Sequence, residues 1–303
     1  MAKRAPYKQH QTEPFQISRS KIEDFVRCPR CFVLDRKHGV ARPSSPPFTI
    51  NTAVDTQLKK EFDLHREAGT VHPVVAAAGL NLVPFKHPLM DEWRENFTGV
   101  RHTTQDFVVT GAVDDIWVNE NGELVVVDYK ATSRAEAVTE LGEGGFYNGY
   151  RRQMEIYQWL LRQNGFKVSS TGYWLYETAT KKEPNFDGVL HFEAALIAYE
   201  GNTNWIESTL AQMKEALDEV ELPYSGDDCD LCRFARERNR VLAQFADNDE
   251  LPPKCNTCGN VMGRALYGMP AGDPGPGFVV MGCIIGDAPL KWVCGHCKAD
   301  EWA

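Results

Sequence analysis

The stretch "GAVDDIWVNENGELVVVDYKAT", residues 111–132, predicts a β-hairpin around which the rest of the chain can be read. Two strand-like runs, residues 105–118 and 123–131, flank the dipeptide Asn121-Gly122, which is a strong turn signal. The second run is apolar enough to be buried, yet it ends in an acidic and a basic side chain. Buried charges cost desolvation free energy, so the pattern indicates more than a packed pair of strands.

The register of this hairpin decides which acidic residues meet. Asp128 and Lys130 lie on one strand face because side chains alternate along a strand. Asp114 and Asp115 of the first strand lie on opposite faces, so one of them can join Asp128. A two-residue turn would place Asp115 opposite Asp128, whereas a three-residue loop with Gly122 left-handed would place Asp114 there. The residues alone leave both registers open.

Paired carboxylates at the end of a hairpin indicate a cation site. Like charges this close repel each other unless a cation lies between them. Oxygen ligands suit Mg²⁺ or Mn²⁺, with water and a phosphate completing the coordination. Lys130 beside such a site can orient or deprotonate the attacking water, or offset charge in a phosphoryl transition state. The alternative is a structural Asp–Lys ion pair at a sheet edge.

The composition is that of an ordinary globular protein, with 303 residues, 43% of them hydrophobic and 25% charged. No apolar run reaches the roughly 18 residues of a membrane helix, and the polar start lacks an apolar signal region, so we expect a cytoplasmic protein without membrane contact. The net charge of −9 argues against a basic protein that coats nucleic acid. A polyanionic partner has to be held by a local patch or through metal ions.

The predicted elements beyond the hairpin are a helical start in 17–38, helices over 51–69, 150–165 and 202–222, and strands over 168–178 and 188–200. Four motifs run along these elements: "SRSKIEDFVRCPRC" at 18–31, Gly111-x-x-Asp114, Asp128-Tyr129-Lys130 and Gln153-x-x-x-Tyr157. Their order resembles the PD-(D/E)XK nuclease superfamily and, within it, the RecB-type branch, which includes CRISPR-associated exonucleases. The resemblance covers most of residues 18–240. It implies an α/β, restriction-endonuclease-like fold, in which helices flank a mixed sheet.

The resemblance assigns roles to the hairpin residues. It implies that Asp114 and Asp128 are ligands of Mg²⁺ or Mn²⁺, with help from the Tyr129 carbonyl. It favours Asp114 over Asp115 for this role, and hence the longer loop. Lys130 is then the catalytic lysine.

Two helices supply the remaining implied positions. Gln153 and Tyr157 lie four residues apart on one helix face and would position the substrate or the lysine. Without the resemblance, a core tyrosine and a solvated glutamine explain this pair better. The RecB branch often carries a metal-binding histidine in its first core helix, and Asp55 stands at the matching position here. Glu61 and His65 on the same helix are further candidates, with ordinary surface positions as the alternative.

Eight of the nine cysteines fall in four Cys-x-x-Cys pairs, which points to metal binding rather than to disulfides. Cys255, Cys258, Cys294 and Cys297 enclose a short glycine-rich segment with little core of its own. A zinc ion held by four thiolates would stabilise such a segment, which resembles a zinc ribbon. Its role could be a nucleic-acid contact, a protein contact or a structural cap. Cys283 is left over and is expected to be a small buried apolar residue.

The other two pairs lie about two hundred residues apart, Cys28 and Cys31 near the start and Cys229 and Cys232 after the last predicted helix. Some relatives in the family join the two ends of the nuclease domain with a [4Fe-4S] cluster, usually through one upstream and three downstream cysteines. The two-plus-two arrangement here departs from that pattern. The resemblance favours the cluster, while the cysteine pattern alone fits zinc as well. The alternative is that the first pair consists of buried helix residues.

These observations lead to one functional hypothesis and one alternative. We expect a Mg²⁺- or Mn²⁺-dependent deoxyribonuclease, exonuclease-like by resemblance, that acts on single- or double-stranded DNA in repair, recombination or defence. The alternative is a non-catalytic nucleic-acid-binding or assembly protein with the same fold. The expected organisation is a disordered lead-in over 1–16, a nuclease-like domain over 17–250 and a zinc ribbon over 251–303.

Overall fold

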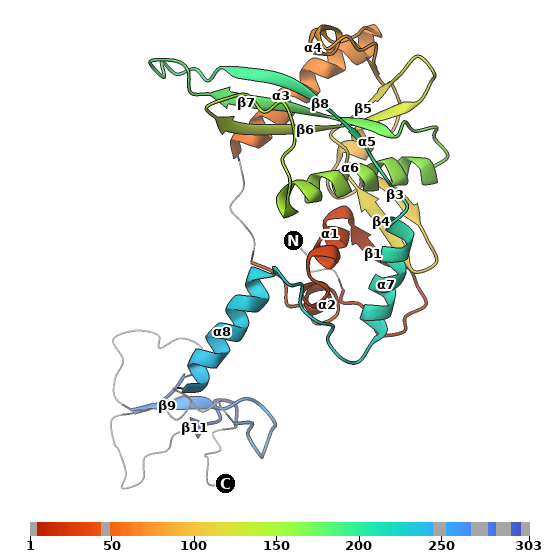
Figure 1. Ribbon diagram of the computed structural model, residues 1–303. Coiled ribbons are helices and arrows are strands. Elements are labelled where there is room, and N and C mark those ends of the chain that lie inside the picture. Colours follow the sequence, from red (N-terminus) through yellow and green to blue (C-terminus); the bar gives the residue numbers. More distant parts are fainter. Residues whose placement is uncertain (1–4, 44–48, 245–252, 268–277, 283–291, 298–303) are drawn as a thin grey trace. The chain divides into compact units, whose positions relative to one another are not determined.

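The computed structural model describes residues 5–43, 49–244, 253–267, 278–282 and 292–297 (Figure 1). The chain divides into two compact units, residues 1–232 (unit 1) and 233–303 (unit 2). The expected boundary at residue 250 stays a prediction, and Cys283 lies outside the described residues. Within the described part of the chain, no helix has the length and apolar character needed to cross a membrane.

A five-stranded mixed sheet forms the centre of unit 1. Its strand order is β2-β5-β6-β7-β8. The bounds are β2 Val83–Pro84, β5 Asp115–Val118, β6 Leu124–Arg134, β7 Thr171–Thr180 and β8 Phe192–Glu200. Only β6 and β7 of this sheet run parallel, and the other neighbours are antiparallel. A mixed sheet flanked by helices confirms the fold class expected from the sequence.

A second, three-stranded sheet and the helices complete unit 1. The strands are β1 Phe15–Ser18, β3 Val100–Thr103 and β4 Phe107–Gly111, in the order β1-β4-β3. The helices are α1 Arg19–Arg27, α2 Pro29–Arg36, α3 Thr49–Ala68, α4 Pro73–Ala77, α5 Met90–Arg94, α6 Gly145–Gln163 and α7 Ile206–Asp218. A further helix, α8 Asp230–Gln244, runs across the division between the units.

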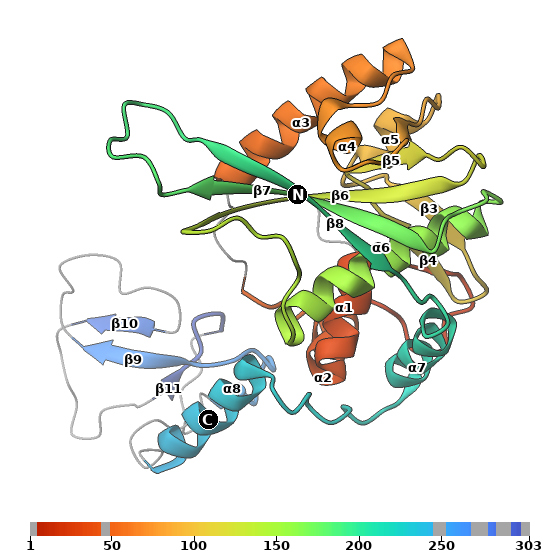
Figure 2. The same ribbon diagram turned by 45° about the horizontal axis from the view of Figure 1, so that its top comes forward.

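Two helices cover opposite faces of the five-stranded sheet, and the alternation of β6 explains why. Figures 1 and 2 show α3 on one face and α6 on the other. On the α3 side, Phe62 packs with Val125 and Val127 of β6 and stacks on Trp117 at 5.1 Å between ring centroids. On the α6 side, Val126 belongs to the larger core. Both faces of β6 are therefore buried, and its charged end emerges from a covered strand.

The hairpin differs from the expected continuous pair of strands in one respect. Residues 112–114 belong to no strand, so the first predicted strand is split into β4 and β5. The loop between β5 and β6 has the three-residue form: the N–H of Asn119 donates to the carbonyl of Glu123 over 3.0 Å, and Gly122 has a φ of 71°. A left-handed glycine closes such a loop without strain.

The beginning of the chain differs from the sequence-based expectation in two places. The helical segment over 17–38 is two helices, α1 and α2, separated at Cys28, whose extended backbone ends one helix and begins the next. Part of the segment expected to be a disordered lead-in is packed. Tyr7 is 3% exposed, its hydroxyl donates to Asp218 over 2.7 Å, and β1 already begins at Phe15.

Unit 2 contains a small three-stranded sheet of order β10-β9-β11. The strands are β9 Gly263–Tyr267, β10 Phe278–Gly282 and β11 Trp292–Val293. Its buried cluster among the described residues consists of Met262, Trp292 and two cysteines, Cys255 and Cys294. Such a small apolar core contributes little by itself, so a metal ion held by the four cysteines would stabilise this unit.

Candidate active site and cysteine metal centres

The register of the hairpin brings Asp114 opposite Asp128. Asp115 pairs with Val127, so the adjoining position of the antiparallel ladder faces Asp114 toward Asp128. The backbone N–H of Tyr129 donates a hydrogen bond to Asp114 Oδ2 over 2.9 Å. Asp114 therefore lies in the break between β4 and β5, and a backbone N–H of the neighbouring strand β6 holds its carboxylate in place.

Asp128 is a fully buried carboxylate with half of its hydrogen-bonding capacity unused. Its exposed fraction is 0%, its Oδ2 accepts from the Lys130 ammonium, and its Oδ1 has no hydrogen-bond partner in the described part of the chain. Burial raises the pKa of Asp128 to about 7; Lys130 opposes this increase and Asp114 adds to it. A buried carboxylate oxygen that accepts no hydrogen bond and lies beside a second carboxylate is a candidate cation ligand.

Lys130 lies between this carboxylate and an aromatic ring. Its Nζ is 4.6 Å from the centroid of the Tyr150 ring, within cation–π range. Its side chain is 14% exposed. Burial lowers the pKa of Lys130, but the negative charges of Asp128 and Asp114 outweigh burial, so the net pKa is raised. The ammonium therefore stays charged.

Gln153 and Tyr157 of α6 lie beside this group, as their helical spacing predicts. The Gln153 amide donates to the Tyr157 hydroxyl over 3.1 Å, and both side chains are buried. Burial raises the pKa of Tyr157, the nearby Arg19 guanidinium lowers it, and Asp114 and Asp128 raise it further. The two predicted helix positions therefore share one electrostatic environment with the carboxylates.

Asp55 faces the same region from α3, but a lysine accompanies it. Lys59 Nζ is 2.9 Å from Asp55 Oδ2 and 3.8 Å from Asp114 Oδ1. Burial raises the pKa of Asp55, and the negative charge of Asp114 raises it further. A cavity of about 220 Å³ opens here, and its lining residues are Asn51, Val54, Asp55, Tyr129, Lys130, Ala131 and Tyr150.

Asp115 points away from this site into a buried ion network. It is 0% exposed and receives hydrogen bonds from the guanidinium groups of Arg66 and Arg94, the latter over 3.0 Å. The Tyr129 hydroxyl donates to it over 2.7 Å and the Trp117 indole over 3.3 Å. These partners satisfy the carboxylate, so Asp115 is a structural residue.

The two further candidates on α3 have other partners. Glu61 Oε1 lies 2.9 Å from His72 Nε2. His65 Nδ1 lies 2.9 Å from the Thr70 hydroxyl, beyond the end of the helix. Both side chains are engaged in fixing the turn that follows α3, so neither joins the carboxylate site.

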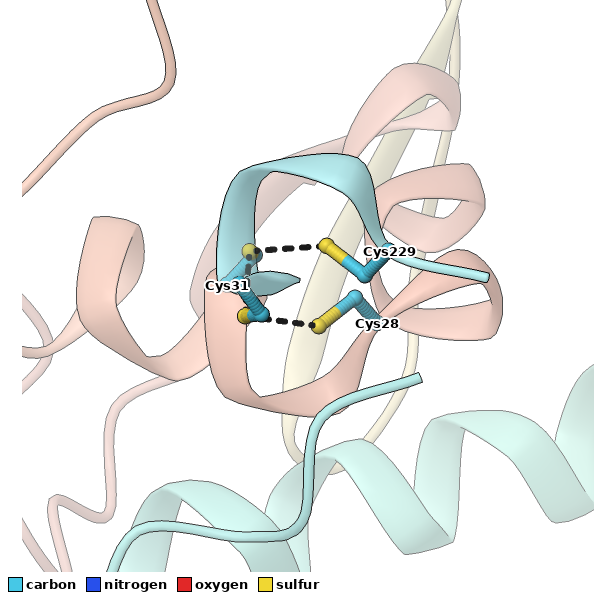
Figure 3. Close-up of side chains that lie close together, drawn as sticks. Cys28, Cys31 and Cys229 are labelled. Atoms are coloured by element: carbon cyan, nitrogen blue, oxygen red, sulfur yellow. Dashed lines mark hydrogen bonds between the residues drawn. The ribbon is translucent and has the colours of Figure 1, made fainter. Parts of the chain in front are cut away.

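The first cysteine quartet comes together inside unit 1. The Sγ atom of Cys31 is 3.6 Å from that of Cys229 and 3.5 Å from that of Cys232, and Cys28 Sγ is 3.7 Å from Cys232 Sγ. Figure 3 shows the sulfur atoms of three cysteines turned toward one another: Cys28 from the break between α1 and α2, Cys31 from the first turn of α2, and Cys229 from the segment before α8. All four ligand atoms lie within 4.8 Å of one another, as a metal site requires.

Close backbone approach makes this quartet possible. The N–H of Gly226 donates to Cys28 Sγ over 3.3 Å, and a Cβ added to Gly226 would lie 2.1 Å from the carbonyl oxygen of Arg27. Only glycine fits there. Burial raises the pKa of the Cys28 thiol, but the backbone N–H groups of Cys31 and Gly226 outweigh burial and lower it to about 7. N–H groups that point at a sulfur favour the thiolate, which is the metal-binding form.

The second quartet lies inside unit 2 and has the same local geometry. Cys255 Sγ is 3.4 Å from Cys297 Sγ, and Cys258 Sγ is 3.5 Å from Cys294 Sγ. The backbone N–H of Cys258 lowers the pKa of Cys255 to about 6, against a smaller opposing effect of burial. Both predicted quartets are thus brought together, although the zinc-ribbon assignment of the second stays a prediction.

The order and geometry of these residues agree with a comparison to known families. The model for the PD-(D/E)XK nuclease superfamily matches residues 16–236. This chain belongs to the PD-(D/E)XK nuclease superfamily. Among solved structures it resembles the crystal structure of SSO0001, with 16% identity and a TM-score of 0.35 over 71% of this chain and 81% of that one. The comparison with curated proteins found no match.

Three residues near this PD-(D/E)XK site were not singled out by the sequence analysis. Tyr150 is three residues before Gln153 on α6, and Lys59 is four after Asp55 on α3, so helical spacing alone would have found both. Arg19 begins α1. Burial lowers the pKa of its guanidinium, but the Tyr157 hydroxyl and the Asp128 carboxylate outweigh burial and raise it. No local pattern marks Arg19, because only the fold brings α1 to α6.

The donor set of this PD-(D/E)XK site suits a divalent cation. Two carboxylates and a nearby backbone carbonyl are hard oxygen ligands. One of these oxygens, Asp128 Oδ1, accepts no hydrogen bond from the described part of the chain. Among the described residues, the cysteine quartets are the only groups of three or more ligands within 4.8 Å of one another. The carboxylates are less converged, and Lys59 lies between two of them.

Proposed function

We propose that this PD-(D/E)XK protein is a Mg²⁺- or Mn²⁺-dependent deoxyribonuclease that hydrolyses phosphodiester bonds from strand ends, in repair, recombination or defence. Membership of the superfamily supports phosphodiester hydrolysis. The resemblance of the opening and central motifs to the RecB-type branch supports DNA as the substrate and exonuclease action.

One observation carries the proposal: Asp128 is buried opposite Asp114 and in contact with Lys130, and one of its oxygens has no hydrogen-bond partner among the described residues. A purely structural aspartate in that position would be satisfied in the way that Asp115 is. Leaving a buried charge half-satisfied costs stability. This loss of stability is explained if the oxygen binds a cation during function.

The residues that would hold the cation are Asp114, Asp128 and the Tyr129 carbonyl, with Asp55 as a further ligand from α3. When bound, the cation supplies Lewis-acid chemistry: it neutralises phosphate charge and lowers the pKa of water. Lys130 keeps its proton in this environment, so its Nζ would donate to the attacking water or to a phosphate oxygen.

The α6 side chains would hold this lysine and the substrate in place. Gln153 donates to the Tyr157 hydroxyl, which leaves the Gln153 carbonyl oxygen to orient a donor. Tyr150 supports Lys130 through its ring face. Water is the nucleophile in this scheme, so no covalent enzyme intermediate forms.

A nuclease assay on Lys130→Ala tests the proposal. Protein purified without air is incubated with labelled single-stranded and duplex DNA and Mn²⁺ or Mg²⁺, in linear and circular form. We expect cleavage of linear DNA that needs the cation and falls by at least about a hundredfold in the variant. Lys86→Ala, an exposed lysine 65% accessible, is the matched control and should cleave normally. Cation-replete, folded protein that leaves all substrates intact would sink the proposal.

The sulfur separations support zinc at both quartets. Zn–S bonds are about 2.3 Å, which places the sulfurs of a tetrahedral site about 3.8 Å apart. The observed 3.5–3.7 Å at the first quartet is close to that value. In a [4Fe-4S] cluster each cysteine binds a different iron, so the sulfurs lie farther apart.

Metal analysis of anaerobically purified protein distinguishes the two. We expect two zinc ions per chain, and one after Cys31→Ser or Cys258→Ser. Stoichiometric iron and sulfide with visible absorption that Cys31→Ser removes would instead establish the cluster that the family resemblance implied.

A further inference from the structure

The start of α6 carries a cluster of aromatic side chains, made by Phe146, Tyr147 and Tyr150. The Phe146 ring centroid is 5.4 Å from that of Tyr147 and 4.9 Å from that of Tyr150. Phe146 is 68% exposed, although it contacts two other rings. An exposed phenylalanine at the rim of an aromatic cluster offers a free ring face for a ligand.

This aromatic cluster is continuous with the candidate active site. Tyr150 lines the cavity together with Asp55 and Lys130, and its ring faces the Lys130 ammonium at 4.6 Å. A ligand that rests on Phe146 is therefore next to the proposed catalytic lysine, with Tyr150 between them.

The cluster is held in place by polar contacts around it. The Arg151 guanidinium donates to the Asn148 side chain over 2.9 Å and to the carbonyl of Gly142 over 3.0 Å, which fastens the preceding glycine-rich segment to α6. A Cβ on Gly142 would lie 2.8 Å from the Tyr147 ring, so glycine lets that ring pack against the segment. A surface whose rings are already fixed loses little conformational entropy when a ligand binds.

Positive charge lies beside the rings. Arg134, at the exposed end of β6, donates from Nη2 to the Tyr147 hydroxyl over 2.9 Å. Lys130 contacts another ring of the cluster, that of Tyr150. Aromatic faces with cations next to them are how proteins bind unpaired nucleotides, since bases stack on the rings and phosphates follow the charges.

We propose that Phe146, Tyr147 and Tyr150 form a stacking platform for an unpaired base next to the scissile phosphate. A base inside a duplex has both faces covered by its neighbours, so the platform takes single-stranded DNA or a frayed strand end. The base stacks on Phe146, and the adjoining phosphates lie toward Arg134 and Lys130. This inference rests on the proposed nuclease function and deepens it by naming the form of DNA that enters the site.

Binding measurements on Phe146→Ala test the platform. Fluorescence anisotropy is recorded without added Mg²⁺ or Mn²⁺, using three labelled ligands: a single strand, the same strand made of abasic sites, and a blunt duplex. Wild type should bind the intact strand more tightly than the abasic one. Phe146→Ala should lose about fivefold or more in affinity for the intact strand and nothing for the abasic strand or the duplex, because stacking needs a base.

The matched control is Phe97→Ala, which removes a phenylalanine 62% exposed outside α6 and should bind all three ligands as wild type does. Because Phe146 is exposed, its variant should melt at the wild-type temperature. Equal binding of the intact strand by Phe146→Ala and Phe97→Ala would overturn the platform, as would equal losses on intact and abasic strands.

A parallel cleavage assay separates the two proposals. Metal-dependent cleavage by wild type with unchanged binding in Phe146→Ala leaves the nuclease function standing and rejects the platform. If wild type does not cleave DNA but binds it in a base-dependent way that Phe146→Ala weakens, the platform is kept and the nuclease function is rejected. A wild-type protein that neither binds nor cleaves rejects both.

Discussion

At the scale of single residues, two adjacent aspartates have different tasks. Asp114 lies just before β5 and faces Asp128, whereas Asp115 opens β5 and faces the other side of the sheet. Asp115 is satisfied by Arg66 and Arg94, while Oδ1 of Asp128 has no hydrogen-bond partner among the described residues. Charge satisfaction separates a structural carboxylate from a candidate ligand here.

Replacing each aspartate by asparagine should separate stability from activity. Asp115→Asn leaves Arg66 and Arg94 with only the partly exposed Asp63 as their counter-charge. It should lower the free energy of unfolding by about 3 kcal/mol. Asp114→Asn should abolish metal-dependent cleavage and change stability by less than about 1 kcal/mol, because it removes a repulsion. Urea unfolding and the nuclease assay measure both. A strongly destabilised Asp114→Asn would contradict these roles.

Lys59 should compete with a divalent cation for the carboxylates. Its ammonium is 2.9 Å from Asp55 and 3.8 Å from Asp114, where it offsets their negative charge. Lys59→Met removes this competition and should tighten Mn²⁺ binding by roughly tenfold in a calorimetric or spin-resonance titration. Lys60→Met, the exposed neighbour on α3, is the control. Weaker Mn²⁺ binding in Lys59→Met would mean that the lysine supports the site instead.

At the scale of elements, two short segments hold the ends of unit 1 together. The break between α1 and α2 presents Cys28, and the first turn of α2 presents Cys31. The segment before α8 brings Gly226 against that break. The first residues of the chain are attached to the end of α7. Asp218 accepts hydrogen bonds from the Tyr7 hydroxyl and from the His10 N–H, each over 2.7 Å.

Gly226→Ala should disrupt the first quartet. The added Cβ meets a backbone carbonyl at 2.1 Å, so the segment has to move away from Cys28. We expect loss of one zinc per chain and a lower melting temperature, read by metal analysis and calorimetry. Gly145→Ala is the control, because no atom of the described residues lies within 4 Å of its Cβ position. Full zinc content in Gly226→Ala would show that the close approach is dispensable.

Asp218 should stabilise unit 1 in a pH-dependent way. Burial raises its pKa, but Lys214, Tyr7 and the His10 N–H together lower it from 3.8 to about 2. A carboxylate whose folded pKa is depressed stabilises the fold above its unfolded pKa, and this contribution is lost as pH falls from about 4 toward about 2.

Asp218→Asn tests this contribution. It should destabilise by about 1 kcal/mol at neutral pH, since partial solvation weakens the interaction, and the difference should narrow in acid. Unfolding of both proteins across this pH range measures it. A difference that stays constant with pH would rule out the carboxylate charge as its origin.

At the scale of the whole molecule, each compact unit contains one cysteine quartet. The first joins residues 28–31 to residues 229–232 and so closes almost the entire chain of unit 1 into a loop. The second joins residues 255–258 to residues 294–297 within unit 2. A cross-link that closes a long loop reduces the entropy of the unfolded chain more than one that closes a short loop.

Removing the metal from one quartet should therefore destabilise only the unit that contains that quartet. Cys31→Ser should lower the stability of unit 1 by about 4 kcal/mol or more, as for the closure of a long loop. Cys258→Ser should leave unit 1 unchanged and unfold unit 2. Calorimetry, with cleavage as the readout for unit 1, distinguishes the two variants. Loss of cleavage in Cys258→Ser with unit 1 still folded would show that unit 2 takes part in the activity.

Several features were readable from local sequence because their cause is local. The Asn121-Gly122 turn, the alternation that places Asp128 and Lys130 on one face, and the Cys-x-x-Cys spacings each depend on neighbouring residues. The order of the motifs was enough to indicate the superfamily, and the family model that matches residues 16–236 confirmed it.

Other features depended on the folded chain, because they join residues from distant elements. A shift of one residue in the hairpin would exchange Asp114 for Asp115, and only the three-residue loop settles the register. Periodicity did not predict that Arg19 would lie near Tyr157, or that Lys59 would approach Asp114 as well as Asp55. Sequence periodicity predicts which side chains share one face of a helix or strand. Which faces come into contact depends on packing and strand register, and these are properties of the whole fold.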